Sequence, residues 1–338
     1  MKYITIYTLV ALLALLNFSC EDFTSTEALG LKTPVKGSPE YYEALREYKK
    51  TDHAICFGWW LRSNEPFTAN MANRYMGLPD SMDIVSVVRG IPEPGSETWN
   101  EMQLVRELKG TRFVLFITDQ RVEDLMRLNF PEVSDSDLMS AIDSVAVSLV
   151  DTINKYQIDG LDFDYEPGYG SNSIFGQNGG TGATNDKYTQ RLFKALSKDL
   201  GPASGTGQLL IIDGQFDIGI EPYIDYLAQQ AYNTSSFSSL QSRFRSFGGG
   251  VLPSKKFVVT ENMQTLGGFG ARFMYKGENI GSVTAMAMWN PVEGRKGGFG
   301  GFVFDNDWDD APADAQVKGE LVEYYYLRKG IQIQNPAP

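Results

Sequence analysis

The sequence predicts an α/β protein built as a single (β/α)8 barrel, the TIM-barrel architecture. Eight short apolar segments alternate with segments of mostly helical periodicity along the chain. The apolar segments are continuous rather than alternating, which is typical of parallel strands that are buried on both faces. Eight such units within about 280 residues match the size of a closed barrel. An open, doubly wound sheet is the alternative, but no glycine-rich dinucleotide-binding turn follows the first strand.

The predicted strands are short apolar runs separated by polar or helical segments. In chain order they are Ala54–Trp60, Ser81–Val88, Arg112–Thr118, Ile158–Tyr165, Gln208–Ile212, Tyr226–Tyr232, Lys256–Glu261 and Gly301–Phe304.

The helices between the strands follow from apolar residues spaced three and four apart. The clearest series is Leu138, Ile142, Val145, Leu149 and Ile153, which predicts one long amphipathic helix. Further helices are expected at Glu97–Leu108, at Lys187–Leu200 and at about 236–247, 276–288 and 312–328.

The first residues have the composition of a secretory signal. Lys2 precedes an apolar stretch over residues 3–16, and a small residue stands directly before Cys20. This arrangement resembles a bacterial lipoprotein signal, in which the cysteine is acylated and becomes the mature N-terminus. We therefore expect a signal peptide at 1–19, a lipidated tether at 20–50, the barrel at 51–330 and a tail at 331–338. A plain signal peptide with a chance cysteine is the alternative.

The expected location follows from this segment. The protein would be secreted across the inner membrane and held at the outer membrane or cell surface, with Cys20 as its only membrane contact. The acidic pair after Cys20 is similar to the tract that exports some lipoproteins to the outer surface.

The charge balance excludes several classes of protein. A formal net charge of -12 argues against binding to nucleic acid, which needs basic patches. The single histidine, His53, argues against most metal centres and against serine or cysteine triads. We therefore expect chemistry that depends on carboxylates, hydroxyls and amides, with no metal and no organic cofactor.

Three carboxylates share one face of the fourth predicted strand. Alternate residues of a strand point the same way, so Asp162, Asp164 and Glu166 line one face, and in a barrel this face points inward. Along the strand, each acid then lies closer than the one before to the C-terminal end of the barrel, where barrel active sites lie. Successive acids are roughly 6.5–7 Å apart along the strand. At least one should therefore keep a proton near neutral pH, as a general acid requires.

Two simpler interpretations fit less well. A calcium loop needs glycine directly after its third ligand and glutamate at the twelfth position, where this chain has Pro167 and Ser173. A purely structural role would leave three acids in an apolar strand with no lysine or arginine among them.

The strand also resembles a family signature. Asp159-Gly160-x-Asp162-x-Asp164-x-Glu166 resembles the D-G-x-D-x-D-x-E motif on the fourth strand of family 18 glycoside hydrolases. Gln230-Ala231-Tyr232-Asn233 is similar to that family's Q-x-Y-N pattern on the sixth strand. The glycine-led run at 300–304 is similar to its eighth strand. The resemblance covers about residues 50 to 328.

The resemblance implies substrate-assisted hydrolysis, which departs from the usual scheme of two protein carboxylates. The nucleophile would be the carbonyl oxygen of the substrate's 2-acetamido group. Glu166 would protonate the leaving oxygen and later deprotonate water. Asp164 would accept the acetamido N–H, and Asp162 would share a proton or a hydrogen bond with Asp164.

The remaining site residues are also implied by the resemblance or by their position. The Tyr232 hydroxyl would hold the acetamido oxygen, with Gln230 and Asn233 lining the same pocket. Trp289, before the eighth strand, is a candidate for stacking on a sugar ring. The long loop at 168–184 follows Glu166 directly, and we expect it to shape the substrate cleft.

Three functions remain open. The first is an endo-β-N-acetylglucosaminidase that cuts the GlcNAc-β-1,4-GlcNAc core of N-glycans; the others are a chitinase and a non-catalytic surface glycan-binding protein. Only about forty residues join Glu261 to Gly301, which leaves little room for the extra domain of processive chitinases. Asp164 and Glu166 are both present, which disfavours a pure binder. We expect a monomeric endoglycosidase whose partner is a glycan or glycoprotein.

Overall fold

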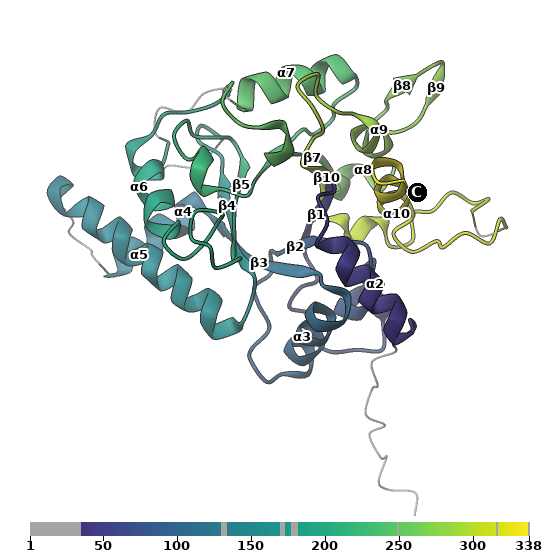
Figure 1. Ribbon diagram of the computed structural model, residues 1–338, viewed down its shortest axis with the longest axis horizontal. Coiled ribbons are helices and arrows are strands. Elements are labelled where there is room, and N and C mark those ends of the chain that lie inside the picture. The colour runs from purple at the N-terminus through teal and green to yellow at the C-terminus, as the bar shows by residue number, and fades with distance from the viewer. Residues whose placement is uncertain are drawn as a thin grey trace, which may run out of the picture. The chain divides into compact units, whose positions relative to one another are not determined.

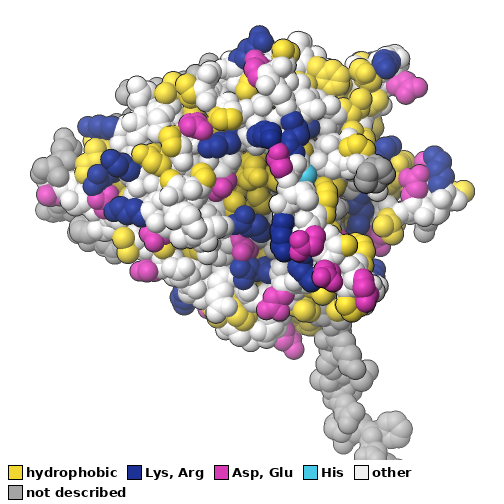
Figure 2. All heavy atoms as spheres, in the orientation of Figure 1, with side chains coloured by type: hydrophobic (Ala, Val, Ile, Leu, Met, Phe, Trp, Pro, Cys, Tyr) yellow, Lys and Arg dark blue, Asp and Glu magenta, His cyan; other side chains and the backbone are white. Residues whose placement is uncertain are grey.

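The computed structural model describes residues 35–129, 134–169, 173–176, 182–248, 250–315 and 317–336. The expected signal peptide, Cys20 and the first part of the expected tether lie outside the described residues. No helix within the described ranges is long and apolar enough to cross a bilayer. Acidic and basic side chains are interspersed across the face of the molecule shown in Figure 2.

Eight parallel strands close into a barrel in the order β1-β10-β7-β6-β5-β4-β3-β2 (Figure 1). This confirms the predicted (β/α)8 barrel. The strands are β1 (Ile55–Trp60), β2 (Ile84–Val87), β3 (Arg112–Thr118), β4 (Gly160–Tyr165), β5 (Leu209–Gly214), β6 (Tyr226–Gln230), β7 (Phe257–Asn262) and β10 (Gly298–Phe302).

Helices surround the strands, with α4, α5 and α6 on one side of the ring in Figure 1 and α8, α9 and α10 on the other. The helices are α2 (Pro39–Lys49), α3 (Glu97–Lys109), α4 (Asp119–Asn129), α5 (Asp135–Tyr156), α6 (Lys187–Leu196), α7 (Phe237–Phe247), α8 (Met263–Leu266), α9 (Ser282–Met288) and α10 (Tyr325–Gln334).

The strand residues divide into two cores, as the alternation along β4 predicts. Phe57, Trp59 and Ile211 belong to a cluster of buried residues inside the barrel. The opposite faces of the strands pack under the helices, where the rings of Phe163 and Phe193 meet edge to face with centroids 5.6 Å apart. The apolar alternate residues of β4 therefore face outward, and its acids face inward.

Two segments between β7 and the C-terminus differ from the prediction. The helix expected at 276–288 begins only at Ser282, because a β-hairpin of β8 (Met274–Tyr275) and β9 (Glu278–Asn279) precedes it. Lys276 and Gly277 both have positive φ, which is the conformation of a tight hairpin turn. Helix α10 starts at Tyr325 rather than near residue 312. At this start, the Asp307 carboxylate accepts the backbone N–H groups of Tyr326 and Leu327.

Both ends of the barrel domain extend further than expected. Residues 39–49 form α2 rather than tether, and Lys49 Nζ bonds the carbonyl of Met82 at 2.6 Å. At the other end, α10 runs past residue 331, and the amide of Asn335 bonds the carbonyl of Ala54 at 2.7 Å. Helix α4 was also not predicted, because its 11 residues are mostly polar.

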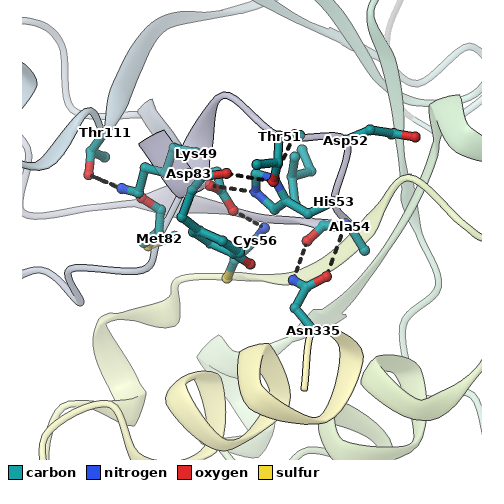
Figure 3. Close-up of polar contacts among 12 residues, drawn as sticks. Lys49, Thr51, Asp52, His53, Ala54, Cys56, Met82, Asp83, Thr111 and Asn335 are labelled. Atoms are coloured by element: carbon teal, nitrogen blue, oxygen red, sulfur yellow. Dashed lines mark hydrogen bonds and ion pairs between the residues drawn. The ribbon is translucent and has the colours of Figure 1, made fainter. Parts of the chain in front are cut away.

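The base of the barrel is held by a cluster of polar contacts around the only histidine (Figure 3). His53 Nε2 lies 3.0 Å from Asp83 Oδ1, and its Nδ1 lies 2.9 Å from the carbonyl oxygen of Thr51. The other Asp83 oxygen accepts the backbone N–H of Cys56 at 2.8 Å. Both ring nitrogens therefore face acceptors, which favours the doubly protonated imidazolium. Burial lowers the pKa of His53, but the hydrogen bond and charge of Asp83 together with the hydrogen bond to Thr51 outweigh this, so the pKa is raised overall.

Candidate active site

The acids of β4 lie at the positions expected from their spacing. Asp162 is fully buried inside the barrel, whereas Asp164 and Glu166 are partly exposed toward the C-terminal mouth. Gly160 begins the strand with φ of +146°, and a Cβ there would lie 2.1 Å from the backbone oxygen of Leu209. Glycine at this position therefore lets β4 approach β5 closely.

A cavity of about 390 Å³ opens beside Glu166. This is within the usual size range of small-ligand sites. It is lined by Glu166, Tyr169, Gly214, Gln215, Gln229, Gln230, Tyr232, Arg243 and Phe247. The structure thus brings together the fourth-strand acid, two predicted residues of the sixth-strand motif and Tyr169 of the long loop. The loop residues 170–172 and 177–181 lie outside the described ranges.

Asp162 is anchored by side chains from two other strands. Its Oδ2 accepts hydrogen bonds from Trp59 Nε1 at 2.9 Å and from Ser86 Oγ at 2.5 Å. Burial raises the pKa of Asp162, and these two donors act in the opposite direction. Trp59 and Ser86 therefore fix the deepest acid of the series.

A fourth carboxyl group, Asp213, completes this cluster and was not predicted. It lies on β5 directly beside Asp164 in the strand register and is 1% exposed. Hydrogen bonds connect Asp213 to both Asp162 and Asp164. Asp162 also raises the pKa of Asp164 through its charge, and the proton or hydrogen bond expected between these two acids stays a prediction.

The surroundings of Asp213 favour its protonated form. Burial raises its pKa well above the ordinary value, and the charges of Asp164 and Asp162 raise it further. Its Oδ1 accepts the Gln230 amide at 3.0 Å, and its Oδ2 is buried and accepts from no donor, so Oδ2 is the oxygen that can carry a proton. The only sequence signal was an aspartate directly after the apolar residues of β5, one position beyond the predicted end of that strand.

Glu166 has the electrostatic surroundings of a proton donor. Burial raises the pKa of Glu166 and the charge of Asp119 adds to this, while a hydrogen bond from Gln230 acts in the opposite direction. Burial likewise raises the pKa of Asp164, and the charge of Glu166 raises it further. A carboxylic acid with a raised pKa at a cavity wall can protonate a leaving group.

The sixth-strand motif contributes unequally. The ring of Tyr232 faces that of Phe302 with centroids 6.3 Å apart, and burial raises the pKa of its hydroxyl well above the usual value. The phenol is thus neutral and can donate a hydrogen bond into the cavity. Gln230 bonds Asp213 and Glu166, as described above. Asn233 has a left-handed backbone with φ of 58°, and its recorded contact is from its backbone N–H to Glu261 Oε1 at 2.9 Å.

The prediction for Trp289 is wrong. The side chain is 5% exposed and belongs to the core between helices and sheet. Its ring packs edge to face on Phe257, which begins β7 at the end of the barrel opposite the cavity. The large apolar area of the indole is better buried there than at the mouth, so Trp289 cannot stack on a sugar at this site.

The chain is similar to known proteins over nearly its whole length. The family model described as "Glycoside hydrolase family 18, BT1044-like" matches residues 20–333. Endo-β-N-acetylglucosaminidase F2 of Elizabethkingia meningoseptica is 25% identical over 336 residues, covering 94% of this chain and 92% of that protein.

Solved structures share the fold. A selenomethionine form of BT1044 has a TM-score of 0.71 and 23% identity, over 88% of this chain and 93% of that chain. Endo-β-N-acetylglucosaminidase from Cordyceps militaris has a TM-score of 0.64 and 24% identity, over 89% of this chain and 98% of that chain.

Proposed function

This chain belongs to glycoside hydrolase family 18, and from that premise we propose that it is an endo-β-N-acetylglucosaminidase. The bond cleaved would be the GlcNAc-β-1,4-GlcNAc linkage in the core of N-glycans. The observation that carries the proposal is the placement of Asp164 and Glu166. Glu166 lines the cavity and has a raised pKa. Asp164 lies next to Glu166 and interacts with Asp213 on the neighbouring strand.

In the proposed mechanism, the carbonyl oxygen of the substrate's 2-acetamido group attacks the anomeric carbon. Glu166 gives its proton to the glycosidic oxygen as that bond breaks, and an oxazolinium intermediate forms. Water then attacks the anomeric carbon, giving its proton to Glu166, and the ring opens. The sum of these steps is hydrolysis, with Glu166 restored to its protonated state.

Asp164 and Tyr232 would hold the reacting group. Asp164 would accept the acetamido N–H, and its negative charge would offset the positive charge that develops on the oxazolinium. The neutral Tyr232 phenol would donate to the acetamido oxygen. Each of these interactions strengthens as the reaction proceeds, which is the requirement for lowering the barrier.

An endoglycosidase is favoured over a chitinase for two reasons. The connection between β7 and β10 contains only α8, the β8–β9 hairpin and α9. It therefore holds no separate domain that could form one side of the cleft. An open cleft suits a branched glycan better than a long linear chain. The similarity to endo-β-N-acetylglucosaminidase F2 extends over nearly the full length of both chains.

The decisive experiment compares defined substrates. The protein is incubated with glycoproteins carrying neutral high-mannose or complex N-glycans and, separately, with chitin oligosaccharides. Release of glycans ending in one GlcNAc, with the other GlcNAc left on the protein, is the expected result by mass spectrometry. Cleavage of chitin oligosaccharides alone would instead indicate a chitinase. Binding of glycans without cleavage by either assay would indicate a glycan-binding protein, and Glu166→Gln serves as the inactive control.

We also propose that the protein is a lipoprotein of the outer membrane or cell surface, acylated at Cys20 after removal of residues 1–19. Because α2 begins at Pro39, the proposed tether is shortened to residues 20–38. Metabolic labelling with a fatty-acid analogue tests this: label should enter the wild type and be absent from Cys20→Ser, with Cys56→Ser as the control that keeps it.

A further inference from the structure

Arg243 is a cation in the wall of the catalytic cavity that the proposed mechanism does not use. It comes from α7 and lines the cavity together with Glu166, Tyr169 and Phe247. Its one recorded hydrogen bond is a long one, from Nη1 to the backbone oxygen of Gln230 at 3.4 Å. Most of the donors of its guanidinium group therefore remain open to a ligand.

Within the described residues, the charge of Arg243 has no carboxylate partner at ion-pair distance. None of the ion pairs among the described residues includes it. Residues 170–172 and 177–181, which lie outside the described ranges, contain no Asp or Glu in the sequence. Glu261 acts on Arg243 only through its charge. The Glu261 carboxylate is fully buried and accepts the backbone N–H groups of Asn233 and Asn262 at 2.9 and 2.7 Å.

The position of Arg243 is partly desolvated, which makes an unpaired charge costly. The side chain is half-buried, and burial lowers its pKa from the ordinary value. An arginine keeps its charge under these conditions. A ligand that brings an anion to the guanidinium would recover the lost solvation, and a carboxylate fits its two parallel N–H donors best.

The surroundings of Arg243 also suit a sugar ring. Tyr169 is 64% exposed at the rim of the same cavity, and Phe247 lies on the next turn of α7. Aromatic rings offer an apolar surface to the face of a sugar. Arg243 is the one cation among the described residues that line the cavity, Glu166 is the acid among them, and the chain has a net charge of -12, so an anionic sugar would be repelled at other positions.

We propose that Arg243, Tyr169 and Phe247 form a subsite that binds the carboxylate of an acidic sugar, so that acidic glycans are cleaved in preference to their neutral counterparts. The inference rests on the proposed endoglycosidase function, because it assigns a substrate preference to that same site. Arg243 is a specificity residue here and takes no part in the proton transfers.

The test compares one biantennary sialylated glycopeptide with the same glycopeptide after its terminal sialic acids have been removed. The ratio of kcat/KM for the acidic substrate to that for the neutral substrate is measured in wild type, Arg243→Gln and Arg243→Lys. We expect this ratio to fall by about tenfold or more in Arg243→Gln, as for loss of a charge-assisted hydrogen bond. The ratio for Arg243→Lys should lie between those of wild type and Arg243→Gln, because lysine keeps the positive charge and lacks the paired N–H donors.

Arg245→Gln is the matched control. Arg245 lies two positions away on α7, is exposed and pairs with Glu293 at 3.2 Å, so its loss should leave the ratio unchanged. Equal losses on both substrates in Arg243→Gln would overturn the proposal and assign Arg243 to neutral sugar hydroxyls or to support of Gln230. An unchanged ratio would overturn it as well.

A binding measurement separates this proposal from the proposed function. Both glycopeptides are titrated into Glu166→Gln and into the double variant Glu166→Gln/Arg243→Gln by calorimetry. If the wild type cleaves neither substrate, the proposed function fails. The acidic glycopeptide should still bind Glu166→Gln about tenfold more tightly than the double variant. Equal binding to the two variants would refute the subsite itself.

Discussion

The Asp213 carboxyl group donates a hydrogen bond to Asp164 across the β4–β5 pair of the barrel. The two residues lie side by side in the strand register, and burial raises the pKa of both, that of Asp164 to about 8. The hydrogen bond between them raises the pKa of Asp213 further and acts to lower that of Asp164. Of the two groups, Asp213 therefore holds its proton more tightly, and Asp164 ionises first. The protonated Asp213 thus orients the carboxyl group that is proposed to face the substrate.

Replacement of Asp213 tests this assignment. Asparagine has the same shape as a protonated aspartate, so Asp213→Asn should still accept from Gln230 and donate to Asp164. We expect its kcat/KM to stay within about tenfold of wild type. Asp213→Ala leaves Asp164 and Gln230 without their partner and should reduce kcat/KM by about 10- to 100-fold. Equal losses in both variants would show that Asp213 acts as an anion.

Glu166→Gln should abolish hydrolysis while leaving the fold intact, because an amide cannot donate the required proton. Loss of general acid catalysis costs about 10²–10⁴-fold. In the wild type, activity should fall as the pH rises through the raised pKa of Glu166, since only its protonated form can act as the acid. Release of N-glycans at near-normal rates by the variant would rule out this assignment.

Asp164→Asn should lower kcat strongly and leave KM nearly unchanged. The contact it removes strengthens only as positive charge develops on the substrate, so it acts on the transition state more than on binding. Steady-state kinetics on a released-glycan assay distinguish the two parameters. A variant with a raised KM and a normal kcat would assign Asp164 to ground-state binding.

Substrate assistance also predicts the stereochemistry. Attack by the acetamido oxygen and then by water inverts the anomeric carbon twice, so the first product should be the β-anomer. A thiazoline analogue of GlcNAc, which mimics the cyclic intermediate, should inhibit competitively. A substrate without the 2-acetamido group should not be cleaved. An initial α-anomer seen by NMR, or a sugar trapped covalently on Asp162 or Asp164, would contradict the mechanism.

The polar cluster at the base of the barrel should make stability depend on pH through His53. Its folded-state pKa is raised, so its contribution is fully present below the unfolded pKa and is lost as the pH rises through the folded value. His53→Gln should therefore lower Tm most near pH 5–6, and the difference from wild type should shrink above pH ~8.

Other charged groups near His53 also contribute to stability, and a control variant accounts for them. They are Asp83, which bonds it, and Arg295, which opposes its charge. The buried Lys49 interacts with the same Asp83, and burial lowers its pKa to about 8. The free-energy cost of burying the charged Lys49 falls as the pH rises. Because this cost is the same in wild type and variant, it largely cancels in the difference between their Tm values. The exposed Lys50→Gln is the control and should show a gap in Tm that does not change with pH. A constant gap for His53→Gln would contradict the pKa argument.

Sequence patterns predicted the parts of this protein that depend on local periodicity. Eight apolar runs predicted the barrel, and the alternation in Gly160–Glu166 placed the acids inside it and their apolar neighbours under the helices. These results follow because a strand repeats every two residues whatever surrounds it. The hairpin at 274–279 was missed because it is short and polar, and the start of α10 depends on a carboxylate, Asp307, from beyond its own segment.

The sequence by itself therefore determined the barrel and the family resemblance, and it predicted Glu166 as the acid. Only the tertiary structure decided which groups surround that acid. Asp213, Trp59 and Arg243 reach the site from different strands and helices, and Trp289 is drawn away from it into the core. Barrel closure and strand register set these neighbours, and both depend on the packing of residues far apart in the chain rather than on any local pattern.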